Sequence, residues 1–339
     1  MKRILSGLTI GILLSGCGGG DGGGGGGGSS TVPVVSGPSP TPSPTPTPTP
    51  APAPTPPPIA GSQPTLLSLT ADTGLEGFAG SNGYYRAPNG QVTYAQDLSV
   101  AATTPVRYNA ATRGFTFTTF DYLVPNDKVT GPFSLTRDAS ASTSSFSEYT
   151  AQSNGISYRL TQLTPGPSNT VLPLYYSSIA IARASYYDSA AGVTKFGLTP
   201  MAFGILFNWD TTKLTGAANY SGIVLGHARG EGSRVYEVSG TVTIALNYDT
   251  TAFTGLLILV GKDDQTGEIV DLGTLALTQN RPRGVLDYFY ANTENDGRLQ
   301  ARLAGSLGEE FMGGFDAKMP DPRTPGAVLK VVLALAARK

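Results

Sequence analysis

The sequence predicts an all-β protein: a small antiparallel eight-stranded β-barrel with a β-rich N-terminal handle region, preceded by a disordered tether. Three observations predict this class. From residue 65 onward no segment keeps a helical period over three or more turns, whereas apolar and polar residues alternate with a period of two. Turn dipeptides such as Asn89-Gly90, Asn154-Gly155 and Asp296-Gly297 separate the alternating runs. Glycine and proline concentrate in about the first 60 residues, and such a composition cannot bury a core.

Residues 1–16 have the organisation of a secretory signal peptide. Lys2 and Arg3 supply a short positive region. The apolar stretch that follows, from Ile4 to Leu14, is too short to span a bilayer as a stable helix. We therefore expect this segment to direct export and then to be removed.

Cys17 follows at once and is the only cysteine of the chain. The run Leu14-Ser15-Gly16-Cys17 resembles the lipobox of bacterial lipoproteins. The resemblance implies that Cys17 becomes the mature N-terminus and carries acyl chains such as palmitate, which anchor the protein in outer-membrane lipid. Gly18 stands where Asp favours inner-membrane retention in enteric bacteria, so the resemblance implies sorting to the outer membrane.

Residues 17–63 form the predicted tether. Gly18–Gly28 is almost pure glycine, and Thr31–Pro58 is a Pro-Thr-Ser-Ala tract with proline at nearly every second position over its second half. Glycine makes a flexible coil, whereas the proline tract favours extended polyproline II. At roughly 3.1 Å per residue the proline tract reaches about 85 Å. Such a spacer would lift a folded region clear of the lipid headgroups.

The remaining chain divides into a handle region, 64–195, and a barrel region, 196–339. The handle is rich in Ser, Thr and Tyr and has weaker strands and longer loops. The barrel region carries a denser series of predicted strands, near 202–209, 219–228, 235–247, 252–261, 270–279, 284–291, 297–303, 309–318 and 327–336. Eight or nine such strands can close into a barrel, which leaves no open edge. Val328–Ala336 is apolar on both faces and fits a terminal strand or a short helix.

Composition excludes several classes of function. The formal net charge is −1, so no basic face for nucleic acid is expected. One cysteine and one histidine exclude an intramolecular disulfide and any site that needs a cysteine or histidine cluster. His227 follows Gly226 and stands close before Arg229 and Glu231, which favours a turn or surface histidine over a haem ligand. Asp263–Glu268 is better explained as a hairpin turn than as a calcium loop. We expect no enzyme, metal or cofactor.

Adjacent tyrosines are the candidate ligand-binding residues. Tyrosine offers a large contact area at low entropic cost and is enriched in recognition surfaces. In a strand, one member of an adjacent pair faces the core and the other faces water. Sheet packing is the alternative explanation for these pairs. The candidate residues are Tyr84, Tyr85, Tyr175, Tyr176, Tyr186 and Tyr187.

The barrel region resembles the lipoprotein barrels related to transferrin-binding protein B. Those barrels carry a Phe-x-Gly-Pro-x-Ala-x-Glu-x-x-Gly-x-Phe signature near their last strands. In the run from Leu303 to Phe315, residues Gly305, Glu310, Gly313 and Phe315 fall at matching spacing, while Leu303 and Ser306 replace the first Phe and the Pro. The resemblance implies that these residues shape the barrel. It also implies capture of an iron source, either haem or an iron-carrying protein, together with a TonB-dependent receptor.

We therefore expect a non-catalytic, lipid-anchored ligand-binding protein of the outer membrane, exposed at the cell surface. The alternative is a periplasm-facing structural or envelope-assembly lipoprotein without a soluble ligand. An exported hydrolase is disfavoured, because no Gly-x-Ser-x-Gly elbow is present and spacing singles out no carboxylate pair.

Overall fold

The computed structural model describes residues 63–339, except for 95–98, 113, 118–134, 154, 209–212, 231–233, 251, 280–288 and 293–296. The signal peptide, Cys17 and all of the tether but Gln63 therefore lie outside the described residues. The described residues belong to one compact unit, Pro57–Lys339, built from strands and connecting turns. They include no helix with the length and apolarity needed to cross a bilayer.

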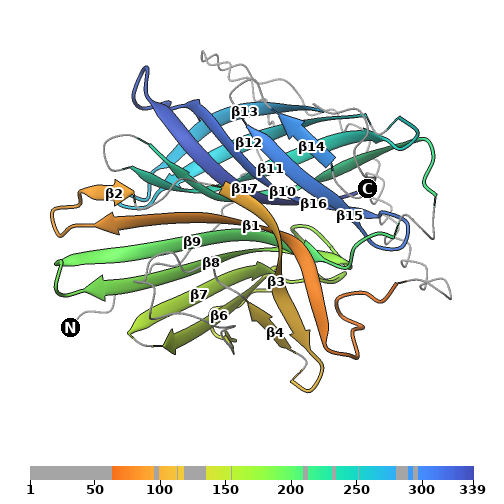
Figure 1. The fold of residues 1–339 in the computed structure, drawn as a ribbon, viewed down its shortest axis with the longest axis horizontal. Coiled ribbons are helices and arrows are strands. Elements are labelled where there is room, and N and C mark those ends of the chain that lie inside the picture. Colours follow the sequence, from red (N-terminus) through yellow and green to blue (C-terminus); the bar gives the residue numbers. More distant parts are fainter. Residues whose placement is uncertain are drawn as a thin grey trace, which may run out of the picture. The chain divides into compact units, whose positions relative to one another are not determined.

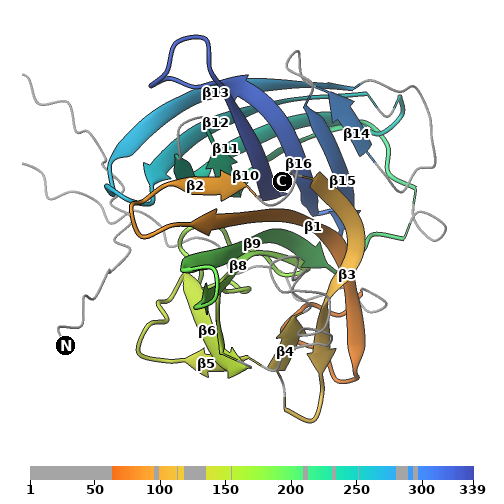
Figure 2. The same cartoon turned by 60° about the vertical axis from the view of Figure 1, so that its left-hand side comes forward.

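The first sheet contains nine strands among the described residues, in the order β4-β3-β1-β9-β8-β7-β6-β5, with β2 paired to β1. Figures 1 and 2 show this sheet from two sides, in orange to green. All of its pairs are antiparallel. Its strands are β1 (Thr73–Arg86), β2 (Val92–Tyr94), β3 (Ser99–Asn109), β4 (Gly114–Phe117), β5 (Thr136–Asp138), β6 (Phe146–Ser153), β7 (Ile156–Leu163), β8 (Ser177–Asp188) and β9 (Val193–Gly204).

The second sheet is a closed eight-stranded antiparallel barrel, which confirms the predicted fold class. Closure comes from the pairing of its first strand with its last, which begins at Ser221 opposite Arg338. The barrel is drawn in teal to blue in Figure 1. Its strands are β10 (Ala217–Arg229), β11 (Val235–Asn247), β12 (Phe253–Asp263), β13 (Ile269–Gln279), β14 (Phe289–Asn292), β15 (Arg298–Ala304), β16 (Glu310–Pro320) and β17 (Val328–Arg338).

Seven of the nine strands predicted in the barrel region match observed strands closely, and most of an eighth, 284–291, lies outside the described residues. The run predicted near 202–209 is not a barrel strand, because β9 ends at Gly204 and belongs to the first sheet. The expected boundary between 195 and 196 falls inside β9, whereas the two sheets meet between β9 and β10. The segment 328–336, which fitted a strand or a helix, lies in strand β17.

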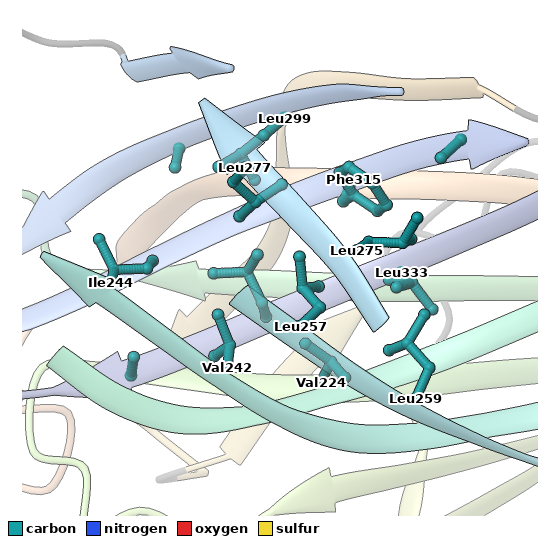
Figure 3. Packing of buried hydrophobic residues seen from close by; sticks show 14 of the residues in the cluster. Val224, Val242, Ile244, Leu257, Leu259, Leu275, Leu277, Leu299, Phe315 and Leu333 are labelled. Carbon is teal, nitrogen blue, oxygen red and sulfur yellow. The ribbon is translucent and has the colours of Figure 1, made fainter. Parts of the chain in front are cut away.

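The barrel is filled by aliphatic and aromatic side chains from alternate positions of its strands. Val224, Leu257 and Phe315 are fully buried there, and Figure 3 shows such side chains converging from several strands. Each large side chain buried in this way contributes about 1.5–3 kcal/mol through the hydrophobic effect. The barrel interior is therefore a packed core.

The outer wall of the barrel packs against the first sheet through a separate apolar cluster. On β17, Leu333 and Leu335 point into the barrel, while Ala334 and Ala336 point outward and contact this cluster. The sheet contributes Ile179 and other residues from β8 and β9. Segment 328–336 is therefore apolar on both faces because one face fills the barrel and the other packs against the first sheet.

Candidate ligand-binding cavity

The six candidate tyrosines do not share one surface. Tyr84 is buried, Tyr187 is 61% exposed, and the other four are half-buried. In the β1-β9-β8 ladder both Tyr85 and Tyr186 are opposite Lys195, so these three side chains share one face of the sheet. Tyr84 lies on the other face, towards the barrel. A binding role for the six tyrosines stays a prediction.

Tyr175 and Tyr176 lie in the loop before β8, and this loop is bound by Glu310 of β16. The backbone N–H groups of Tyr175, Tyr176 and Ser177 donate to the Glu310 carboxylate at 2.6, 3.1 and 2.7 Å, and the Ser177 hydroxyl donates at 2.8 Å. Glu310 is fully buried. Burial raises the pKa of Glu310 to about 7, and the four donors oppose this shift. Glu310 thus joins the barrel to the first sheet.

The other three motif residues lie in or beside the barrel. Gly305 occupies the turn between β15 and β16 at a φ of 88°, and a Cβ there would lie 2.6 Å from the Tyr176 ring. A Cβ on Gly313 would lie 2.6 Å from the Gln300 carbonyl oxygen. Phe315 is fully buried inside the barrel. None of these residues, nor Glu310, lines the cavity described next.

A cavity of about 430 Å³ lies between the first sheet and the outer wall of the barrel. Small-molecule sites usually measure about 300–1,000 Å³, so this volume suits a small ligand. The sheet lines it with residues of β1, β7, β8 and β9, and the barrel with residues of β10, β11 and the β12–β13 turn. The lining residues are Tyr84, Arg86, Ser157, Arg159, Arg183, Ala184, Ser185, Phe196, Leu198, His227, Val235, Glu237 and Asp264.

Two arginines stand side by side on the sheet wall of the cavity. Arg159 of β7 and Arg183 of β8 are direct cross-strand partners, an arrangement that is unfavourable for like charges. Arg183 is held by the barrel, because its Nη2 lies 3.0 Å from Glu237 Oε1 and its Nη1 donates to the Thr161 hydroxyl. Arg159 donates through Nε to Glu148 at 2.8 Å. Its two terminal nitrogens remain available on a side chain that is 52% exposed.

His227 faces these arginines from the barrel wall. Tyr220, Val224 and Ala228 fill the barrel, so the odd-numbered His227 points outward, to the cavity. The side chain is 1% exposed, and the prediction of a turn or surface histidine is wrong. The reason is that β10 is a barrel strand whose outer face the first sheet covers. Neither ring nitrogen makes a hydrogen bond with the described part of the chain.

The imidazole of His227 is neutral at physiological pH. Burial, followed by the positive charge of Arg183, lowers its pKa to about 3. The Glu237 carboxylate, its cross-strand neighbour, and the Tyr236 backbone oppose the shift only in part. A neutral imidazole carries one N–H donor and one acceptor nitrogen. The His227 ring, which lines the cavity, therefore has one group of each kind.

The third side of the cavity joins β1 and β9 to the β12–β13 turn. Tyr84 and Phe196 stack with ring centroids 4.9 Å apart, and the Arg86 guanidinium lies 5.5 Å from each centroid. Asp264 Oδ2 accepts from Arg86 Nη2 at 2.6 Å and from the Tyr84 hydroxyl at 3.1 Å. Arg86 Nε and Asp264 Oδ1 are buried without a hydrogen-bond partner among the described residues.

The acidic segment 263–268 forms the turn between β12 and β13, which confirms the predicted hairpin. Its second aspartate has a further role, because it lines the cavity and binds Arg86. Burial raises the pKa of Asp264, while Arg86 opposes this change. Within the described residues no three His, Cys, Asp or Glu side chains come together in a way that could hold a metal ion.

Sequence reasoning missed most residues of this cavity. It singled out Tyr84 and weighed His227, but gave no role to Arg86, Arg159 or Arg183. Each arginine is an ordinary member of an alternating strand. Only the register between strands, which pairs Arg159 with Arg183, shows that these charges gather. The one available signal was an arginine beside a small polar residue at alternate positions of β7 and β8, which could have indicated that both strands contribute arginines to one face.

Comparisons with known proteins concern the fold. No protein-family model and no curated protein sequence matches the chain significantly. Among solved structures it is similar to isotype 1 transferrin-binding protein B from serogroup B Neisseria meningitidis (12% identity, TM-score 0.34, covering 76% of this chain and 43% of that one). A double mutant of transferrin-binding protein B from Haemophilus parasuis gives 12% identity, a TM-score of 0.35, and coverage of 73% and 47%.

The chain spans about half the length of these transferrin-binding protein B structures. It is also similar to kievitone hydratase from Nectria haematococca, with 10% identity, a TM-score of 0.24, and coverage of 78% and 89%. Transferrin-binding protein B is also the family whose barrel signature the motif between Leu303 and Phe315 resembles.

Proposed function

We propose that this protein is a non-catalytic ligand-binding lipoprotein, anchored in the outer membrane through acylated Cys17 and exposed at the cell surface. The observation that carries the binding role is the cavity between sheet and barrel, where His227 is buried and neither ring nitrogen has a hydrogen-bond partner among the described residues. Buried polar groups in folded proteins are almost always hydrogen-bonded. A ligand that supplies partners to His227, Arg86 and Asp264 accounts for their arrangement.

Binding, rather than chemistry, suits the ion pairs around the cavity. Glu237 and Asp264 are the carboxylates that line it, and each is held by an arginine, Arg183 or Arg86. Carboxylates engaged in this way serve as positioning groups for the guanidinium groups. The groups left over are hydrogen-bond donors and acceptors in fixed places, as in a recognition site.

The finer form of the proposal is capture of an iron source, either haem or an iron-carrying protein, with delivery to a TonB-dependent receptor. Support for it comes from the sequence motif that contains Gly305, Glu310, Gly313 and Phe315. A neutral, unpartnered imidazole such as that of His227 can serve as an iron ligand. Titration of the purified full chain with haem should then give a shifted absorption band that His227→Leu abolishes.

Location is tested by protease treatment of intact cells, with Cys17→Ala as the anchoring control. The surface assignment predicts that the folded region is removed from intact cells, and that Cys17→Ala releases it from the membrane. Protection until the outer membrane is broken would instead favour the periplasm-facing structural role. Failure of both haem and an iron-carrying protein to bind at micromolar concentrations would contradict iron-source capture.

A further inference from the structure

The unpartnered groups of the cavity are mostly hydrogen-bond donors. Arg86 Nε, one nitrogen of His227 and the two terminal nitrogens of Arg159 can each donate. Among the described residues, the acceptors without a partner are Asp264 Oδ1, the second nitrogen of His227 and Glu237 Oε2, because Arg183 binds only Oε1 of Glu237. A ligand that fits this set must therefore be rich in acceptors and carry at most a few donors.

The fork of Arg159 points to one type of acceptor. A guanidinium presents two parallel N–H groups that match the two oxygens of a carboxylate. Glu148 occupies only Nε of Arg159. Arg183, its cross-strand partner, brings a second positive charge beside this fork. Two neighbouring guanidinium groups, each already held by a carboxylate, form a preorganised anion site at the sheet wall.

Part of the remaining lining is apolar. Phe196, stacked on Tyr84, lies at one side, and Leu198 and Val235 line the space between sheet and barrel. An inorganic anion would leave these walls without contact, whereas an organic skeleton would cover them. The buried imidazole of His227 then lies where a second polar group of the ligand would be recognised.

We propose that the cavity binds a small organic carboxylate, with its carboxylate on Arg159 beside Arg183, its apolar skeleton between Phe196, Leu198 and Val235, and a polar group on His227. This inference rests on the proposed function, because the ligand would occupy the cavity to which that function assigns binding. It does not depend on the location of the protein or on iron.

The test uses the purified full chain carrying Cys17→Ala, so that no acyl group is present. The probes are benzoate, benzyl alcohol as the uncharged analogue, and inorganic phosphate as an anion without a skeleton. Binding is measured by isothermal titration calorimetry and by the shift of the thermal midpoint. For a probe as small as benzoate, Kd is expected on the order of 1 mM. At ten times Kd the ratio of folded to unfolded protein then rises about tenfold.

Variants assign the binding to the cavity. Arg159→Lys keeps the charge and the pairing with Glu148 but removes the two-pronged fork, so benzoate affinity is expected to fall about tenfold, by the loss of one charge-assisted hydrogen bond. His227→Leu is expected to lower the affinity of a probe that also carries a hydroxyl group, such as salicylate, more than that of benzoate. Arg298→Lys is the matched control, because Arg298 also pairs with a carboxylate, Asp316, and is 49% exposed; it should leave benzoate affinity unchanged.

Each other outcome overturns the assignment. If no probe binds, or if benzoate and benzyl alcohol bind alike, the cavity is not a carboxylate site. If phosphate binds as tightly as benzoate, the apolar walls take no part. If Arg159→Lys leaves benzoate binding intact, the anion lies elsewhere. If the chain binds haem and is cleaved on intact cells but does not bind benzoate, this inference is wrong and the proposed function stands. If the chain binds benzoate but neither binds haem nor is cleaved on intact cells, this inference stands, while iron-source capture and the surface location are wrong.

Discussion

The inside of the barrel and the space outside its wall are built by opposite rules. Inside, alternate residues of seven barrel strands, β10–β13 and β15–β17, converge on one apolar cluster. Outside, the space between the barrel and the first sheet has two parts. One part is apolar packing around Ile179 and Ala334, and the other is a cavity whose lining includes Arg159, Arg183 and His227. The barrel interior therefore provides stability, which leaves the outer wall next to the first sheet available for ligand binding.

The largest contrast should appear between two phenylalanines. Phe315→Ala empties part of the barrel interior and should lower the free energy of unfolding by about 4 kcal/mol. Phe196→Ala removes a half-buried ring from the cavity wall and should cost only about 1–2 kcal/mol. Urea denaturation of both variants measures the difference. Equal costs would mean that the cavity wall is packed as tightly as the barrel interior.

Glu310 tests the connection between the two regions. Glu310→Ala leaves three backbone N–H groups and the Ser177 hydroxyl without their acceptor, so a loss of about 3 kcal/mol is expected. The control is Glu76→Ala, which breaks an exposed ion pair with Arg302 and should cost about 0–1 kcal/mol. Equal small losses in both variants would show that the loop before β8 does not need Glu310.

His227 gives the cavity a pH dependence that the barrel interior lacks. Its pKa in the folded chain, about 3, lies below the ordinary value of 6.5, so the unfolded chain binds a proton more readily. Stability is therefore lost as pH falls from 6.5 towards 3, by about 3 kcal/mol at pH 4. His227→Leu should remove this part of the acid sensitivity. The check is urea denaturation at pH 7 and pH 4, and an unchanged difference between the two pH values would contradict the assignment.

The smallest effect is expected at Tyr187, the most exposed of the candidate tyrosines. Tyr187→Ala should change the free energy of unfolding by less than about 0.5 kcal/mol, and benzoate affinity should stay the same because Tyr187 does not line the cavity. A loss of binding to an iron-carrying protein in this variant would show a second recognition surface on the first sheet. Calorimetry on the same sample measures both quantities.

The sequence predicted the inside of the barrel far better than the space outside it. Alternating residues such as Val242, Ile244 and Leu246 mark one buried face directly, so most strand positions follow from periodicity, although the run near 202–209 was assigned to the wrong sheet. The sheet-facing wall depends on which outward residues the first sheet covers. His227 was misplaced for that reason, since its neighbours Arg229 and Glu231 suggest a surface turn when β10 is read alone.

The cavity arginines show a second limit of sequence reasoning. Arg159 and Arg183 are 24 positions apart in the sequence, and one residue of slippage between β7 and β8 would place them on opposite faces. Alternation within each strand does not specify that register. Tyr84 was singled out as one of an adjacent pair, and its hydrogen bond to Asp264 arises from a contact across 180 positions that no local pattern encodes.

The pairing of β10 with β17 sets the order of assembly. It joins Ser221 to Arg338, so the barrel cannot close until more than a hundred intervening residues are in place, and such distant pairings form slowly. β10 also carries His227, which lines the cavity on the barrel side. We therefore expect the cavity to be completed late in folding, and the appearance of benzoate binding during refolding to time the closure of the barrel.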